Sequence, residues 1–176
     1  MITTMLFATL AAGGAQAPIK AGTVAPAFTS TGSDGKQHEL KDYTAKGDLF
    51  LYFISDTCPV NAEAEKFYNR LSKAYEGKAT ILGVINTTDK GYKAWQAKFK
   101  APFVVVFDPD LRIIRSYKAN ASPWMVQVGK NGKVAKAWPG YSAPALKEIN
   151  AAMAKVGEVP VAKIDFTGAP ADMAFG

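Results

Sequence analysis

The chain has 176 residues, of which 48% are hydrophobic and 20% are charged, and its 21 Lys and Arg against 15 Asp and Glu leave a formal charge of +6. These values are typical of one globular domain and exclude a disordered tail, a coiled coil and a collagen-like fibre. The single cysteine, Cys58, excludes an internal disulfide and a Cys-only metal site, and the single histidine, His38, excludes most His-rich zinc sites. The role of this solitary thiol is therefore the main question.

The positive charge is spread along the chain. The lysines form no run of five basic residues, and only three Arg are present. This pattern favours a lysine-coated surface and argues against a nucleic-acid partner. The sequence also lacks a phosphate-loop or dinucleotide-binding glycine pattern, and its ligand residues are too few for a metal or haem site. We therefore expect no cofactor and no metal.

The first segment of the chain reads as a targeting signal. Residues 1–17 carry no charge, and the mostly apolar run over residues 5–12 has signal-peptide length and is too short to span a bilayer. Small residues follow it, although a positively charged start is missing. We expect a signal peptide over residues 1–15 and an exported protein, periplasmic or secreted. Because no cysteine lies in this segment, no lipoprotein or membrane anchor is expected.

Strand and helix signals alternate after residue 21. Two hairpins are predicted, with turns at residues 33–35 and 130–132, over residues 28–40 and 124–138. Continuous apolar runs predict strands buried on both faces over residues 48–54, 80–85 and 103–107. Apolar residues at helical spacing predict helices over residues 59–75, 90–99, 111–117 and 143–156.

This order of elements predicts an α/β fold of three layers, in which helices flank a mixed central sheet and the N-terminal β-hairpin is an extension. One domain over residues 21–156 accounts for all of these elements. Residues 157–176 have no helical period, and we expect them to form a tail along the surface.

Cys58 follows the first buried strand, at the turn into a helix. Asp56 or Thr57 is expected to cap this helix, and Pro59 suits its first turn. A thiol at a helix N-terminus faces unpaired N–H groups and the positive end of the helix dipole, which favour the thiolate. Asp56 and Glu63 are candidate carboxylates for tuning it. Most free cysteines are inert core residues, but this position favours a reactive thiol.

The segment Thr57-Cys58-Pro59-Val60-Asn61 resembles the active-site turn of thioredoxin-fold proteins, with Asn61 in place of the second cysteine. Ser122-Pro123 and the predicted strand after it resemble the cis-proline loop of that fold, and residues 101–108 resemble a strand of its peroxiredoxin-like members. The resemblance covers residues 21–156. It is closest to the redoxin branch, the alkyl hydroperoxide reductase/thiol-specific antioxidant family and its exported thioredoxin-like relatives, and it implies a thioredoxin-like fold with a cis bond before Pro123.

The resemblance also implies which residues form the site. The catalytic residues are Cys58, Ser55 and Thr57, and the active-site loop comprises Pro59, Asn61, Ser122 and Pro123. Three departures bear on activity: a second cysteine is missing at Asn61, Leu51 stands where peroxiredoxins have Pro, and Pro123 stands where they have Arg. Arg112 and Arg115 are the remaining candidates for that cation. Any catalytic cycle must take its second thiol from another molecule.

Three functions fit these residues. In the first, an antioxidant oxidoreductase, Cys58 attacks a small peroxide and becomes a sulfenic acid that an external thiol reductant restores, while Ser55 and the Cys58 N–H donate to the peroxide. The second is thiol–disulfide exchange with a client protein through a mixed disulfide. The third is a thioredoxin-fold binding module without turnover. His38 is expected to be a surface residue and not a base for the thiol.

Overall fold

The computed structural model describes residues 17–176. The signal peptide expected over residues 1–15 lies outside the described residues. In the described part, no helix is long and apolar enough to cross a bilayer. The first elements, β1 (Thr29–Thr31) and β2 (Gln37–Glu39), pair in antiparallel fashion, which confirms the predicted N-terminal hairpin.

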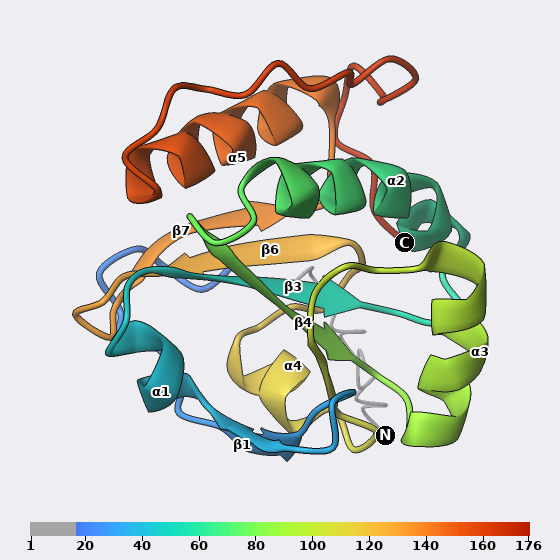
Figure 1. Cartoon of the computed structure of the whole chain (residues 1–176). Helices are drawn as coiled ribbons and strands as arrows, with labels where there is room; N and C mark the ends of the chain where they lie inside the picture. Colours follow the sequence, from blue (N-terminus) through green and yellow to red (C-terminus); the bar gives the residue numbers. More distant parts are fainter. Residues whose placement is uncertain (1–16) are drawn as a thin grey trace, which may run out of the picture.

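The central sheet has five strands in the order β5-β4-β3-β6-β7 (Figure 1). β3 pairs with β4 and β4 with β5 in parallel, whereas β6 is antiparallel to β3 and β7 is antiparallel to β6. All residues of β3 are buried, as expected of a central strand that is covered on both faces. The strands are β3 (Leu49–Ile54), β4 (Thr80–Ile85), β5 (Val105–Phe107), β6 (Trp124–Val128) and β7 (Val134–Pro139). The prediction of a mixed sheet is confirmed.

Helices cover both faces of the sheet. The helices are α1 (Leu40–Thr44), α2 (Pro59–Ala74), α3 (Asp89–Phe99), α4 (Arg112–Ser116) and α5 (Ala143–Val156). α2, α3 and α5 share one apolar cluster, to which they contribute Phe67, Trp95 and Leu146. α1 and α4 share the other cluster with the N-terminal segment. Figure 1 shows α2 and α5 above the sheet and α1 and α4 below it, which is the three-layer arrangement predicted.

Two elements differ from the prediction. β5 is shorter than expected because its ladder with β4 pairs only residues Val105 to Phe107. The short helix α1 was not predicted, since its five residues are too few to reveal a helical period and Leu40 was assigned to the hairpin. Neither difference alters the sheet order or the position of Cys58 between β3 and α2.

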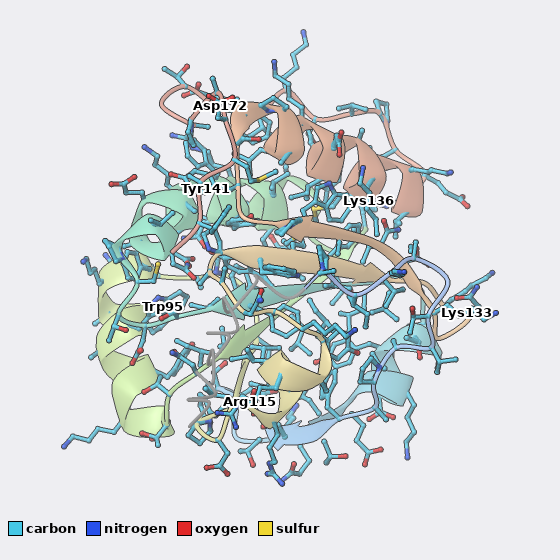
Figure 2. All side chains as sticks on the ribbon, turned by 180° about the vertical axis from the view of Figure 1, so that it is seen from behind. Trp95, Arg115, Lys133, Lys136, Tyr141 and Asp172 are labelled. Atoms are coloured by element: carbon cyan, nitrogen blue, oxygen red, sulfur yellow. The ribbon has the colours of Figure 1, made fainter. Side chains whose placement is uncertain are left out.

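The tail, residues 157–176, contains no helix, as predicted, but part of it is packed. Its apolar side chains contact the cluster under α2 and α5: Val159, Ala162, Ile164, Phe166, Ala169 and Ala174. Tyr141, which follows β7, forms an antiparallel bridge with Ala174. Figure 2 shows Tyr141 and Asp172 at the same end of the molecule, and in Figure 1 the tail passes α5 and ends near the start of α2.

Candidate active site around Cys58

Cys58 lies beyond the carboxyl end of β3, where α2 begins. Pro59 is the first helical residue, so Cys58 is itself the N-cap, and its sulfur accepts the Asn61 N–H at 3.4 Å. The predicted caps, Asp56 and Thr57, are wrong because the fixed φ of Pro59 starts the helix directly after Cys58. The sulfur therefore accepts an N–H group of the first helical turn that has no partner within the helix, and this position stabilises negative charge.

The loop before β6 faces the sulfur from the neighbouring strand. The antiparallel ladder of β3 and β6 aligns Phe53 with Trp124, which brings the preceding Ser122–Pro123 to the end of β3. The peptide bond between Ser122 and Pro123 is cis, as the resemblance implied. Cys58 Sγ donates to the Ser122 carbonyl oxygen across 3.6 Å. Cys58 and Ser122 thus meet although they are far apart in the sequence.

Asn61, at the position of the missing second cysteine, joins three parts of the site through hydrogen bonds of its side chain. Its side chain is fully buried. Its Oδ1 accepts hydrogen bonds from the Ser55 N–H at 3.0 Å and from the Ser122 hydroxyl. Its Nδ2 donates to the Tyr52 hydroxyl at 2.8 Å and to Glu65 Oε1. Asn61 therefore links β3, α2 and the loop before β6, which its place in the motif did not reveal.

Glu65 is a buried carboxyl group that sequence reasoning missed. The residue is 1% exposed; its Oε1 accepts from the Tyr52 hydroxyl at 2.8 Å, whereas its Oε2 has no hydrogen-bond partner among the described residues. Burial raises the pKa of Glu65 to about 8, although hydrogen bonds from Tyr52 and Asn61 act to lower it. The signal in the sequence was spacing, because Asn61, Glu65 and Tyr68 lie on one inward stripe of α2.

The hydroxyl groups of Ser55 and Thr57 do not bond to the sulfur. The Ser55 hydroxyl accepts from Asn86 Nδ2 at 3.4 Å, and the Ser55 carbonyl accepts the Cys58 N–H at 3.4 Å. Thr57 is exposed and lines the hollow in front of Cys58. Of the two donors that were expected to bind a peroxide, the Cys58 N–H is therefore engaged with the Ser55 carbonyl, whereas the Ser55 hydroxyl acts as an acceptor for Asn86.

Two hollows flank the site. The first, of about 520 Å³, contains Cys58 and extends to Trp95 on α3. The second, of about 370 Å³, is lined by Ser122 and by two cationic side chains, Arg115 and Lys118. Arg115 lines the second hollow and not the one that contains the thiol, and Figure 2 shows it on α4, whereas Trp95 projects from α3. Among the residues that the structure describes, no arginine therefore lines the hollow around the sulfur.

The end of the tail contacts the same loop. The Gly176 N–H donates to the Ser122 carbonyl at 2.8 Å, and the Ser122 N–H donates to the Gly176 carbonyl at 2.9 Å. This reciprocal pairing is that of two antiparallel strands. It places a segment of the chain's own tail beside Cys58, which the absence of any period in residues 157–176 could not reveal.

The remaining titratable candidates bond elsewhere. His38 Nε2 lies 2.8 Å from Asp34 Oδ1, and its Nδ1 lies 2.6 Å from the Tyr43 hydroxyl. The His38 side chain is 12% exposed and is partly covered by the hairpin and α1, and neither of these two contacts of its ring nitrogens involves the thiol. Glu63 accepts a hydrogen bond from Tyr141 at 3.5 Å. Over residues 17–176, no three acidic, histidine or cysteine side chains gather in a way that would hold a metal.

Comparison with known proteins matches the profile of the AhpC/TSA family to residues 21–137. The chain is 26% identical over 120 residues to the thiol-disulfide oxidoreductase ResA of Geobacillus thermodenitrificans, a match that covers 67% of this chain and 68% of that protein. It is 24% identical over 102 residues to the chloroplastic peroxiredoxin Q of Suaeda salsa, with 57% of this chain and 48% of the relative covered. The chain thus spans about half the length of that peroxiredoxin.

A solved structure supports the fold. The thioredoxin domain of a thiol-disulfide oxidoreductase from Bacteroides vulgatus superposes with a TM-score of 0.66 at 22% identity, covering 78% of this chain and 99% of that domain. The predicted thioredoxin-like fold is confirmed by this similarity and by the mixed, helix-covered sheet with its N-terminal strand pair.

Proposed function

The chain belongs to the AhpC/TSA family, and on that premise we propose that it acts as a thiol–disulfide oxidoreductase with Cys58 as its one working thiol. One observation carries the proposal: Cys58 Sγ lies 3.6 Å from the carbonyl oxygen of Ser122, whose own N–H and C=O pair with an extended segment. Backbone pairing of this kind binds extended polypeptides with little regard to their side chains. The favoured substrate is therefore a client protein with an accessible disulfide.

The proposed reaction is a pair of displacement steps. The Cys58 thiolate attacks one sulfur of the client disulfide, an S–S bond forms between Cys58 and the client, and the other client sulfur leaves as a thiolate that takes up a proton. Because Asn61 replaces the second cysteine, a thiolate from an external molecule must then attack the mixed disulfide. That attack releases the Cys58 thiolate and leaves the client sulfur bonded to the external thiol.

Neighbouring groups have defined tasks in these steps. The Asn61 N–H, 3.4 Å from the sulfur, stabilises the thiolate that attacks and later leaves. The Asn61 side chain holds Ser55 and Ser122 against each other, which keeps the client-pairing backbone in register with the sulfur.

The loop residues around the thiol orient it. Pro59, as the first residue of α2, directs the helix N-terminus at Cys58. Pro123 holds the Ser122 carbonyl on the side of the sulfur. Thr57 lines the entrance to the sulfur.

Reduction of a small peroxide is the second candidate, and the exposed hydroxyl of Thr57 in the hollow of Cys58 favours it. The Cys58 thiolate would attack one peroxide oxygen, the O–O bond would break, and the departing alkoxide or hydroxide would take up a proton. One external thiol would convert the sulfenic acid to a mixed disulfide with loss of water, and a second would restore the thiol. The Ser55 hydroxyl, which accepts from Asn86 Nδ2, would donate its own proton to the peroxide.

Intact mass spectrometry of the reduced protein tests both candidates. Brief exposure to a disulfide-bearing peptide is expected to add one peptide to the chain at Cys58. Exposure to a limited amount of hydrogen peroxide is expected to add an oxygen atom more slowly, because the lining of the thiol's hollow lacks an arginine. Faster gain of oxygen than of peptide would make peroxide reduction the main activity.

The Cys58→Ser variant is the control and is expected to gain neither mass. The serine hydroxyl is close in size to the thiol, so the fold is retained while the nucleophile is lost. A wild-type thiol that survives many equivalents of both reagents would contradict the oxidoreductase proposal and leave the binding module as the explanation of the site.

Export to an extracytoplasmic compartment is proposed on the apolar start of the chain. A thiol that works by exchange with external thiols is also compatible with an oxidising compartment. Expression of the full chain in a bacterium, followed by fractionation and intact mass, tests this proposal. The expected product is found outside the cytoplasm and lacks the first 15 or so residues, and full-length chain confined to the cytoplasm would contradict it.

A further inference from the structure

The end of the tail, residues 174–176, lies where the proposed client would bind. Gly176 pairs with Ser122 through two backbone hydrogen bonds of 2.8 and 2.9 Å. Two residues earlier, Ala174 pairs with Tyr141 through two hydrogen bonds of 2.9 Å each. The tail therefore runs as a short extended strand past Ser122, and it uses both backbone groups that a client would need.

Gly176 is also the residue that approaches the sulfur. A Cβ atom added to Gly176 would lie 3.0 Å from Cys58 Sγ and 3.4 Å from Val60 Cγ2. In a disulfide, the S–S length of about 2.05 Å places each Cβ about 3 Å from the opposite sulfur. The position of Gly176 therefore matches the position of a residue joined to Cys58 by a mixed disulfide.

We propose that residues 174–176 act as a built-in pseudo-substrate, in which Gly176 occupies the place of the cysteine of an extended client polypeptide. The inference rests on the proposed thiol–disulfide exchange and deepens it by naming the form of the client and a device that limits its access. Glycine suits this role because it has no side chain to clash with the thiol and none to react with it.

The contact between the last residues of the tail and Ser122 is easily displaced. Phe175 is 58% exposed and Gly176 is exposed, so the last residues bury little apolar surface. Upstream, Ala174 and Phe166 are packed against the cluster under α2 and α5. A client can therefore replace the final residues at Ser122 while the rest of the tail stays in place. Compared with a site that is always free, the apparent affinity of the site for the client falls only by the fraction of time that the tail is bound.

The second hollow indicates which client segments fit. Gly176 and Ser122 line it together with Arg115 and Lys118, and none of the described residues in its lining is acidic. A segment that replaces Gly176 would place its neighbouring residues at this hollow. Acidic side chains next to the client cysteine are therefore favoured over basic ones by charge complementarity.

Gly176→Cys tests the geometry directly. A cysteine at this position is expected to form an intramolecular disulfide with Cys58 under a stoichiometric amount of diamide, detected by the loss of both thiols in a monomer. Ala171→Cys is the matched control, because it adds an exposed cysteine to the same tail and is expected to remain unbridged. Bridging in both variants, or in neither, would overturn the placement of Gly176.

Removal of residues 174–176 tests the control of access. The shortened chain is expected to form a mixed disulfide with a disulfide-bearing acidic peptide roughly tenfold faster than the full chain, because the backbone hydrogen bonds of the tail no longer compete. The same peptide with lysines beside its cysteine is expected to react several-fold more slowly with either chain. Equal rates for the two chains, or faster reaction of the lysine peptide, would overturn the inference.

Failure of the inference can be distinguished from failure of the proposed function. A shortened chain whose Cys58 reacts with neither peptide overturns the exchange proposal and, with it, the client. A full chain that reacts as fast as the shortened one, with Gly176→Cys unbridged, overturns the pseudo-substrate alone and leaves the exchange reaction in place.

Discussion

The two sides of Cys58 are built differently. Behind the sulfur, the side chains of Tyr52, Asn61 and Glu65 are almost wholly buried and bond to one another between β3 and α2. In front of it, Phe175 is 58% exposed, and Gly176 is held at Ser122 by backbone hydrogen bonds alone. One side is a buried polar network, and the other is an exposed segment of tail.

The position of the thiol therefore depends on the buried network behind it, whereas access to the thiol depends on the tail in front of it. In a buried polar network, each group that loses its partner is costly because the dielectric is low. Changes behind the sulfur should therefore alter the stability of the fold and the register of the site together. Changes in front should alter reaction rates while leaving stability nearly the same.

Asn61→Leu is expected to be the most destabilising of these substitutions. The substitution leaves the Ser55 N–H and the Ser122 hydroxyl without their shared acceptor and removes the donor to Glu65. The free energy of unfolding should fall by roughly 3 kcal/mol, as measured by urea denaturation. Asn131→Ala, in the exposed turn between β6 and β7, is the control and should cost less than about 1 kcal/mol. Similar losses in the two variants would contradict a cooperative network behind the thiol.

Glu65→Gln is expected to change how stability depends on pH. Burial raises the pKa of Glu65 from 4.5 to about 8, so between these values the unfolded chain is ionised while the folded chain stays protonated. Since the folded state then binds more protons, the free energy of unfolding of the wild type falls as pH rises from about 5 to 8. The Gln variant lacks this loss and should be more stable than the wild type at pH 8 by roughly 4 kcal/mol, since each unit of pKa shift is worth about 1.4 kcal/mol.

Denaturant unfolding of both proteins at a series of pH values measures the effect. The two proteins should be nearly equal in stability at low pH, where the carboxyl group is protonated in both states. Glu63→Gln, at an exposed residue of the same helix, is the matched control for the loss of one carboxyl group. A Glu65→Gln profile parallel to that of the wild type would show that the buried carboxyl group does not titrate between folded and unfolded states as its burial implies.

The sequence predicted the part of the site that depends on local pattern. Apolar runs located β3, β4 and β5, and Pro59 after Cys58 located the start of α2, so the thiol could be placed at the end of a buried strand. The pairing of Ser122 with the site followed from the order of the strands and the resemblance to thioredoxin-fold proteins. The strands and the helix start are each encoded by residues that lie close together in the chain, which is why a single sequence reveals them.

Other features depended on contacts between distant residues. Glu65 was not singled out from the sequence, because its burial arises only when the helix packs on Tyr52 of the sheet. The cap was misplaced because the sulfur of Cys58, and not an oxygen, accepts the Asn61 N–H. The return of Gly176 to Ser122 joins the end of the tail to the loop before β6 by backbone groups alone. Backbone pairing leaves no mark in side-chain composition, so no sequence pattern could predict it.

Phe175→Ala should have the smallest effect on stability and still alter the thiol. The Phe175 ring lies against Gly140, where an added Cβ would be 3.1 Å from Cδ1, but the side chain is 58% exposed. The free energy of unfolding should therefore change by less than about 0.5 kcal/mol, while mixed-disulfide formation at Cys58 rises roughly two- to threefold because the tail leaves Ser122 more often. Val161→Ala, at 56% exposure in the same tail, is the matched control and should change neither quantity. A rate increase in both variants would mean that the whole tail limits access to the thiol, whereas an increase only for Phe175→Ala would place that control in its last residues.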